Sequence, residues 1–289
     1  MRLLVTSDLH YDHANSRDSA AALIERINAE ENIDAVVLAG DTAGAAGSAL
    51  EECLGLFRRR RAMLFVPGNH ELWTQGGDSY ALFAGELPRR VRNAGWQWLQ
   101  TDPFAAGRCA VVGSIGWYDY SFATDGLGIP RRFYEHKMSP GAAAQLEDCA
   151  GLSPAADDVP PAARELVARW NDGRFVNLGR SDEEFLQEIL GALEAQLAAV
   201  SHVPHVAAVV HHVPFAEMLP EADADLWRFT RAFLGSRRIG ELLLRFANVR
   251  CVLCGHSHYP VESEVEGVRL ISIGSGYRRK IYRIVELPD

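Results

Sequence analysis

The sequence predicts an α/β fold, because short apolar runs alternate with amphipathic helical stretches over residues 1–100. The first three runs cover residues 3–5, 36–38 and 63–66 and are rich in the aliphatic side chains of buried strands. A helical stripe of apolar residues at 23–27 lies between the first two runs. This order is typical of β–α–β units, in which helices cover a largely parallel sheet.

The second half of the chain continues the same alternation. Two more apolar runs cover residues 206–210 and 250–254. A capping box that opens at Ser181 predicts the start of a long amphipathic helix. The tail, from 261 to 285, alternates like an antiparallel strand meander. Since no repeat or strong boundary interrupts the chain, we expect one domain over residues 1–289.

Residues 121–180 differ from the rest, because their periodicity fades and Pro, Gly and Ala become frequent. A connection of this length is unusual in a compact domain and is often functional. We therefore predict an insertion beside the active site. Four of its side chains, Arg131, Arg132, His136 and Lys137, either hold a substrate phosphate or are ordinary surface groups.

Composition limits the classes of function. The chain has 289 residues, of which 48% are hydrophobic, and this is enough for a large core. Its net charge of −9 argues against a broad nucleic-acid surface, although local basic patches remain possible. The sequence shows neither a signal-peptide core nor an apolar stretch long enough to span a membrane, so we expect a cytoplasmic protein without a membrane partner. The five cysteines are too few and too irregularly spaced for a disulfide framework.

All five apolar runs end in side chains that can bind metal. They are Asp8 and His10, then Asp41, then Asn69, His70 and Glu71, then His211 and His212, and finally His256 and His258. In an open α/β sheet, side chains at the carboxyl ends of the strands converge on one crevice. A buried carboxylate is costly without a partner, and a divalent cation offsets that cost. The pattern therefore predicts a metal site.

The order of these motifs resembles the calcineurin-like metallophosphoesterase family. The matching motifs are Asp-x-His, Gly-Asp, Gly-Asn-His-Glu, His-x-Pro and Gly-His-x-His. They cover the core at both ends of the chain and leave the region from 100 to 200 largely unmatched. The resemblance implies a metallophosphoesterase-type sandwich of two mixed β-sheets flanked by helices. It also implies a metal-dependent hydrolase that cleaves phosphomonoesters or phosphodiesters.

The resemblance further implies a dinuclear centre and its ligands. By motif position, Asp8, His10 and His258 would hold one ion, Asn69, His212 and His256 the other, and Asp41 would bridge both. Nitrogen and oxygen donors suit divalent or mixed-valence Mn, Fe, Zn, Ni or Co. A hydroxide activated by both ions would attack phosphorus. The family's catalytic histidine corresponds to His70, which would act as an acid or as a stabiliser of charge.

Three positions near the motifs leave alternatives open. Both His211 and His212 precede the proline of the fourth motif, and the position usual in the family favours His212. His13 lies beside the first motif and is expected to be a surface residue of the loop, since seven ligands are already supplied. Glu71 follows His70 directly and could orient a histidine.

Two other functions compete with a hydrolase of small esters. A nuclease acting on DNA or RNA would use a basic, aromatic-lined groove, for which the basic run at 278–280 and the aromatic cluster at 117–120 are candidates. A non-catalytic metal-binding scaffold would be free to lose the ligands and His70, and all of them are present. We therefore expect a small phosphorylated substrate as the partner, and the sequence does not indicate an oligomeric state.

Overall fold

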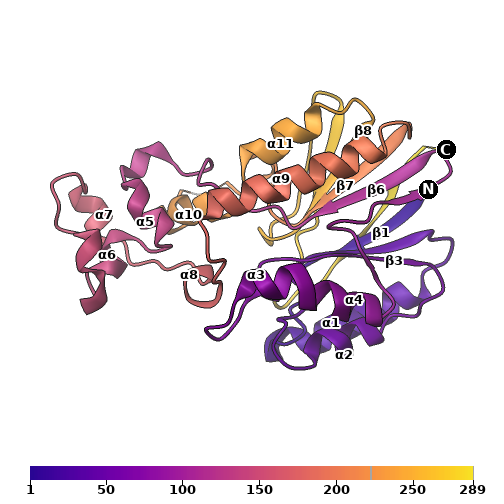
Figure 1. Ribbon diagram of the computed structural model, residues 1–289, viewed down its shortest axis with the longest axis horizontal. Helices are drawn as coiled ribbons and strands as arrows, with labels where there is room; N and C mark the ends of the chain where they lie inside the picture. The colour runs from indigo at the N-terminus through magenta and orange to yellow at the C-terminus, as the bar shows by residue number, and fades with distance from the viewer. Residues whose placement is uncertain (222, 289) are drawn as a thin grey trace.

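Two mixed β-sheets pack face to face, and helices cover their outer faces (Figure 1). The computed structural model describes residues 1–221 and 223–288. In the first sheet the strand order is β11-β1-β2-β3-β4, with β1 to β4 parallel and β11 antiparallel to β1. These strands are β1 (Arg2–Thr6), β2 (Ala35–Ala39), β3 (Ala62–Val66), β4 (Gln97–Trp98) and β11 (Tyr282–Glu286).

The second sheet has the order β5-β6-β7-β8-β10-β9. Its four central strands are parallel, and its two edge strands run antiparallel. These strands are β5 (Phe104–Ala106), β6 (Cys109–Ser114), β7 (His205–Val210), β8 (Val249–Cys254), β9 (Val261–Val265) and β10 (Val268–Ser272). The predicted sandwich of two mixed sheets is confirmed.

The meander expected for the tail is wrong for its last strand. β9 and β10 pair antiparallel, but β11 leaves that sheet and pairs with β1 of the other one. There it covers an edge of the first sheet and buries Val285 between the sheets. Strand alternation alone does not specify which sheet a strand joins.

The core has separate layers because successive strand residues face opposite sides. Leu3 and Val5 of β1 lie in the layer between the sheets, whereas Leu4 lies in the layer under the helices. The same alternation sends Cys251 to the inner layer and Cys254 to the outer one. All five cysteines, which lie within the described residues, are free thiols.

Helices on the two outer faces come from different parts of the chain (Figure 1). The helices near the first sheet are α1 (Ala14–Ala29), α2 (Ala49–Gly55), α3 (Ser79–Ala81), a π-helical turn (Leu82–Glu86) and α4 (Leu87–Asn93). Those on the second sheet are α9 (Asp182–Ala199) and α11 (Arg237–Leu244). The capping box at the start of α9 is confirmed, since the side chains of Ser181 and Glu184 each bind the other's backbone amide.

Short helices beyond the sandwich form a lobe at the end opposite the chain termini (Figure 1). They are α5 (Arg131–Glu135), α6 (Pro140–Ala143), α7 (Pro161–Glu165), α8 (Asp172–Phe175) and the nearby α10 (Asp225–Thr230). The 3-10 turns of the chain are His70–Leu72, Asp125–Leu127, Glu147–Leu152, Ala216–Met218 and Arg231–Phe233. Phe229 of α10 stacks on Tyr134 of α5, with ring centroids 5.2 Å apart. Within the described ranges, no helix has both the length and the apolar character that crossing a membrane requires.

Gln196 connects α9 to the second sheet through buried hydrogen bonds. Its side chain accepts from the amide of Gly113 (3.2 Å) and donates to the carbonyls of Gly113 (2.8 Å) and Gln100 (2.9 Å). We expect Gln196→Ala to lower the free energy of unfolding by about 1–3 kcal/mol, because these buried backbone groups lose their partner. Urea denaturation measures the change.

Gln187→Ala is the matched control for this prediction. Gln187 is exposed on the same helix and contacts Arg238 at the surface. The control should change the free energy of unfolding by less than about 0.5 kcal/mol. Equal effects of the two substitutions would contradict the role of Gln196.

Candidate metal centre

The loops after β1, β2, β3, β7 and β8 meet at the carboxyl ends of the parallel strands. Backbone hydrogen bonds join the first two loops. The amide of Asp8 donates to the carbonyl of Gly40 (2.9 Å), and the amide of His10 donates to the carbonyl of Asp41 (2.9 Å). The amide of His256 donates to the Asp8 carboxylate (3.0 Å). Residues from both ends of the chain therefore share one site.

Backbone strain is concentrated at the predicted ligands. Ten non-glycine residues of the described chain have positive φ. Five of them are predicted ligands, namely Asp8 (53°), His10 (44°), Asp41 (53°), His256 (66°) and His258 (56°). Side chains other than Gly seldom adopt this conformation, and when they do it is often at functional sites. The folded loops hold these residues in a costly conformation that aims their side chains into the site.

Two groups of donor atoms share Asp41. In the first, Asp8, His10, Asp41 and His258 offer atoms within 4.8 Å of one another, and in the second Asp41, His211 and His256 do the same. In the first group, Nε2 of His258 lies 3.4 Å from Oδ1 of Asp8, and Nε2 of His10 lies 3.9 Å from Oδ2 of Asp41. Asp41 is thus placed between two candidate sites.

His211, rather than His212, faces Asp41. Nε2 of His211 lies 3.3 Å from Oδ1 of Asp41 and 3.3 Å from Oδ1 of Asn69, while its Nδ1 lies 2.9 Å from the carbonyl of Ala39. The ring of His212 lies between Trp117 and His256, at 4.9 Å and 4.2 Å between ring centroids. Its Nδ1 contacts the carbonyl of Ile115, and its Nε2 has no partner among the described residues.

The reason for this orientation is the strand alternation of β7. Val209 faces the layer between the sheets and Val210 faces the helices. Continuing the alternation puts His211 between the sheets, beside Asp41, and His212 on the outer side. The alternation was therefore the sequence signal that distinguishes the two histidines.

Asp172, from the 121–180 segment, fixes Asn69. Its buried carboxylate accepts hydrogen bonds from the amide of Asn69 (2.8 Å), from the indoles of Trp73 (2.7 Å) and Trp170 (2.8 Å), and from the hydroxyl of Tyr118 (3.1 Å). The Asn69 amide nitrogen is thereby used, and its oxygen is left to face His211. Sequence reasoning missed Asp172, since it belongs to none of the motifs.

Glu71 holds the loops around Asp41 rather than a histidine. Its fully buried carboxylate accepts from the backbone amides of Asp41 (3.0 Å), Thr42 (2.6 Å), Ala43 (3.1 Å) and Gly68 (2.6 Å). The hypothesis that Glu71 orients a histidine directly is replaced by this role. Asp41 and Gly68 follow different strands, so one carboxylate fixes both loop ends together.

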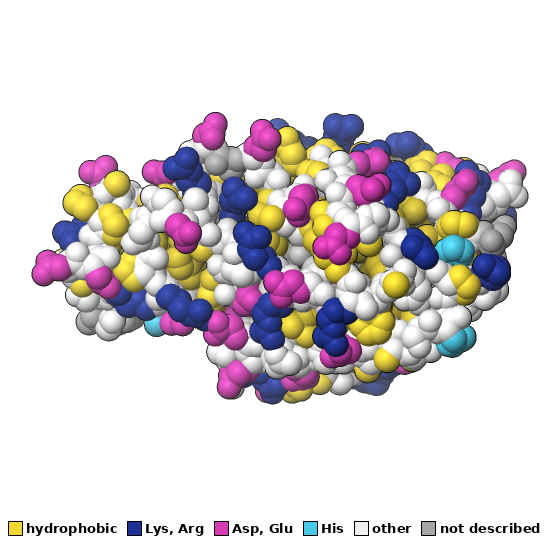
Figure 2. Space-filling view, turned by 90° about the horizontal axis from the view of Figure 1, so that it is seen from above, with side chains coloured by type: hydrophobic (Ala, Val, Ile, Leu, Met, Phe, Trp, Pro, Cys, Tyr) yellow, Lys and Arg dark blue, Asp and Glu magenta, His cyan; other side chains and the backbone are white. Residues whose placement is uncertain are grey.

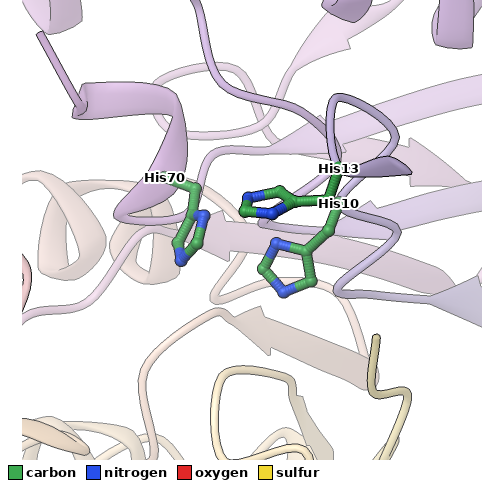
Figure 3. A group of neighbouring side chains, drawn as sticks. All are labelled: His10, His13 and His70. Carbon is green, nitrogen blue, oxygen red and sulfur yellow. The ribbon is translucent and has the colours of Figure 1, made fainter. Parts of the chain in front are cut away.

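His70 is buried between Asp41 and the aromatic ring of Trp73. Its Nε2 lies 3.7 Å from Oδ2 of Asp41, its ring stacks on Trp73 at 3.6 Å, and its Nδ1 has no partner among the described residues. Nitrogens of His10, His13 and His70 lie within 4.8 Å of one another, and Figure 3 shows the three rings gathered around one space. His13 is therefore a neighbour of the site and not only a surface residue of the loop.

The cations expected from the insertion are engaged elsewhere. Arg132 pairs with Asp158 (2.6 Å), Lys137 pairs with Asp182 (2.6 Å), and Arg131 pairs with Glu135 (2.9 Å) and Glu183. His136 contacts the carbonyl of Arg132 (2.8 Å). None of the four lines the pocket at the metal centre, where Arg169 is found instead.

Lys280, the last residue of the basic run at 278–280, supports the site from behind. It is buried, and its ammonium donates to the backbone carbonyl of Asp8 (2.6 Å). Burial lowers the pKa of Lys280 to about 8, although the nearby Asp8 and Asp41 carboxylates act in the opposite direction. This lysine is therefore part of the site's framework and not of an exposed basic groove.

A pocket of about 340 Å³ opens above the donor groups. Its lining residues are Asp41, Asn69, His70, Trp73, Arg169, Trp170, Asn171, Leu226, Trp227, Thr230, Leu234, His256, Ser257, His258 and Tyr277. Five of these residues are predicted ligands or the predicted catalytic histidine. Trp73 and Ser257 come from the loops that carry those residues, and the others come from the lobe, from α10 and its flank, and from the C-terminal tail. A ligand in this pocket would contact the metal centre and the lobe together.

Buried carboxylates and imidazoles shift one another's pKa values strongly. Burial disfavours the charged form of Asp8, but a hydrogen bond and charge from His258 lower its pKa to about 2. Burial also disfavours protonated His211, yet Asp41 and Asp8 raise its pKa to about 9. Burial lowers the pKa of His256 to about 3 and that of His10 well below its usual value. The carboxylates therefore demand positive charge, which a metal ion would supply in place of a proton.

The donor set fits metal ions. Its members are carboxylate oxygens, an amide oxygen and imidazole nitrogens, all of which bind divalent transition metals. His211 also fits a ligand because its Nδ1 contacts a backbone carbonyl, which leaves Nε2 directed at Asp41 and Asn69. These His and Asp groups could hold metal.

The fold and the clustered donors define a class of protein, the metal-dependent phosphoesterases. A family model described as calcineurin-like phosphoesterase matches residues 1–260. The chain belongs to the calcineurin-like phosphoesterase family, and it is an enzyme that hydrolyses phosphoric esters.

Individual relatives agree with the family. The chain is 25% identical to the [acyl-carrier-protein] phosphodiesterase PptH of Mycobacterium tuberculosis, over 99% of this chain and 83% of that protein. Its fold resembles the crystal structure of the phosphopantetheinyl hydrolase PptH from the same organism, with a TM-score of 0.70, 20% identity and coverage of 99% and 96%. A dimetal phosphatase of Danio rerio is also similar, with a TM-score of 0.52, 13% identity and coverage of 98% and 91%.

The raised pKa of His211 predicts a pH dependence of the metal-free protein. A pKa raised from 6.5 to about 9 contributes stability that is present below pH 6.5 and is lost as the pH rises towards 9. Between pH 6.5 and 8 we expect His211 to account for a loss of up to about 2 kcal/mol. Chemical denaturation of protein treated with a chelator measures it.

His211→Asn is the comparison, because an amide cannot titrate. Glu71, whose pKa burial raises to about 8, also makes stability fall as the pH rises, in the variant as in the wild type. Lys280, with a pKa lowered to about 8, acts only above this window. If the free energy of unfolding fell equally with pH in the wild type and in the variant, the assignment of the proton to His211 would be refuted.

Proposed function

We propose that the protein is a dinuclear metal-dependent phosphodiesterase. The observation that carries the proposal is that two donor groups share the carboxylate of Asp41. In the first position the ligands are Asp8, His10, His258 and Asp41. In the second they are Asn69, His211, His256 and Asp41, with His211 in place of the expected His212.

When bound, a pair of transition metal ions polarises the phosphoryl group and activates a water molecule for attack. The donors are all nitrogen and oxygen, so Mn, Fe, Zn, Ni and Co all remain suitable. Other residues of the chain hold the predicted ligands in place. Asp172 fixes the side chain of Asn69, and Glu71 fixes the loop that carries Asp41. These contacts keep the donor atoms in place without reorganisation during the reaction.

His70 would act on an oxygen of the ester. Burial lowers its pKa, so that the ring is neutral near pH 7 and carries one N–H. Stacking on Trp73 fixes the ring plane at the edge of the pocket. A neutral ring in this place donates a hydrogen bond to a phosphoryl or leaving oxygen, and so stabilises the charge that develops there.

A diester rather than a monoester is supported by a relative. PptH, by name, is a phosphodiesterase of acyl-carrier protein and a phosphopantetheinyl hydrolase. We infer a similar substrate class for this chain, namely an organic arm joined through phosphate to a second alcohol. As for its location, we infer that the protein works in the cytoplasm, because all five cysteines are free thiols and a reducing compartment keeps thiols reduced.

Nucleic acid is the less favoured substrate. The face over α9 and α11 carries acidic and basic side chains side by side, without a continuous basic stripe (Figure 2). Among the residues that line the pocket, Arg169 is the one Lys or Arg. Both features differ from the basic groove that follows a nucleic-acid backbone. The non-catalytic scaffold is set aside because the chain belongs to a family of enzymes.

The ligand assignment is tested by counting ions. We expect the purified protein to bind two ions per chain after reconstitution with Mn²⁺ and to hydrolyse bis-p-nitrophenyl phosphate. His211→Ala should reduce the count to about one and activity by at least about 10²-fold, because a direct ligand is lost. His212→Ala should retain two ions. Plasma emission spectrometry and the release of p-nitrophenol measure both, and loss of an ion in the His212 variant alone would contradict the assignment.

The role of His70 is tested with leaving groups of different basicity. We expect His70→Ala to retain both ions and to lower kcat by about 10²–10³-fold. If His70 stabilises charge on the phosphoryl group, the loss should be similar for p-nitrophenyl and phenyl esters. A much larger loss for the phenyl ester, which needs more help at the leaving oxygen, would show that His70 donates a proton instead.

A further inference from the structure

We propose that the pocket beside the metal centre is a binding site for one arm of the diester, an uncharged flexible chain with hydrogen-bonding groups, and that Leu226 and Trp227 of α10 form its outer wall. The proposal rests on the proposed function, because it needs an ester with a second organic arm. It assigns substrate selection to the lobe and to α10, neither of which carries a metal-binding motif.

Exposed apolar side chains gather around this pocket. The described chain has six large hydrophobic residues that are clearly exposed, and they are Leu56, Val167, Leu226, Trp227, Tyr259 and Tyr277. Three of them line the pocket. Val167 is two residues from the lining residue Arg169, and Tyr259 directly follows the lining residue His258. Leu56 ends a helix elsewhere. Half of these exposed residues thus line the pocket itself.

Some aromatic rings of the pocket are held in place by neighbouring residues, and one is not. The indole nitrogens of Trp73 and Trp170 are both held by Asp172, and Trp170 stacks on Phe233 (5.4 Å). These two rings form a fixed inner wall. Trp227 makes no ring contact within the described residues and is 48% exposed, so about half of its surface is open to a ligand. Covering this surface with an apolar chain would be favourable.

A flexible chain fits this arrangement better than a nucleobase. A base sandwiched between two rings would need two free ring faces, but Trp73 is stacked on His70 and Tyr277 on His10. Trp227 is the one tryptophan of the pocket that stacks on no other ring of the described residues. An apolar chain needs only a surface to cover and no second ring.

The polar groups of the pocket indicate the chemistry of the arm. Arg169 and Asn171 line the pocket, and within 1–221 and 223–288 their side chains make no hydrogen bond or ion pair. They can bind the acceptor oxygens of amides or hydroxyls. The one carboxylate of the lining is Asp41, which faces the metal ligands. A cationic arm would thus lack a free partner.

The test uses one phosphoserine peptide with four different arms on its phosphate. The arms are pantetheinyl, methyl, 2-aminoethyl and adenosin-5′-yl, and the Mn²⁺-loaded enzyme is assayed by mass spectrometry. We expect kcat/KM for the pantetheinyl ester to exceed each of the other three by at least about tenfold, since burying the arm against the pocket wall strengthens binding. Equal values for methyl and pantetheinyl, or a preference for the adenosyl or aminoethyl arm, would overturn the proposal.

Two variants test whether α10 causes the preference for the pantetheinyl ester. Leu226→Ala combined with Trp227→Ala should lower the pantetheinyl-to-methyl ratio of kcat/KM by about tenfold. Leu56→Ala is the matched control, because it also removes an exposed leucine but lies away from the pocket, and it should leave the ratio unchanged. A ratio that is unaffected in the double variant would remove α10 from substrate selection.

A binding measurement separates this proposal from the proposed function. By calorimetry, pantetheine 4′-phosphate should bind the Mn²⁺-loaded protein at least about tenfold more tightly than inorganic phosphate, and the double variant should abolish most of this difference. If no diester is hydrolysed but the difference is found, the activity is wrong and the arm site stands. If the two affinities are equal, the arm site is wrong whatever the activity.

Discussion

The burial of the Asp41 carboxylate is the constraint on which the rest of the site depends. Burial opposes its charge, yet His70 and His211 hold its pKa well below the usual range. Gly68 permits this approach, because an added Cβ would lie 2.2 Å from Oδ1 of Asp41 and 2.7 Å from Nε2 of His211. Glu71 then joins the two loops, since its carboxylate accepts from the amides of Asp41, Thr42 and Ala43 in one loop and of Gly68 in the other. Each of the two donor groups that share this carboxylate could hold a metal ion beside it.

The lobe contacts this centre through the hydrogen bonds of one buried carboxylate. Asp172 binds a predicted ligand, Asn69, and the two tryptophans of the pocket's inner wall through one carboxylate. A shift of Asp172 would therefore move the metal centre and the substrate wall together. The long, weakly periodic segment thus has two roles beside the site, since it holds the side chain of Asn69 by a hydrogen bond and lines the pocket.

Much of the fold and of the site could be predicted from the sequence, because the strands are apolar runs and the predicted ligands directly follow them. The apolar runs predicted the parallel strands, and their terminal Asp, Asn and His residues converge as expected at one edge. Family spacing favours His212, whereas the alternation of β7 places Val209 and His211 on one side, and His211 is the one that lies against Asp41. Glu71 and Asp172 act through contacts with backbone amides and with residues distant in sequence, and no local pattern encodes such contacts. The sheet joined by β11 is likewise decided by packing on β1 and not by its own residues.

The central claim is that Asp41 lies between two metal ions. The most direct measurement is anomalous diffraction from crystals of the Mn²⁺-loaded protein, collected at an energy where Mn scatters anomalously. The account predicts two strong peaks per chain, one beside Asp8, His10 and His258 and the other beside Asn69, His211 and His256, with the Asp41 carboxylate between them. A single peak, or peaks that do not contact Asp41, would contradict it.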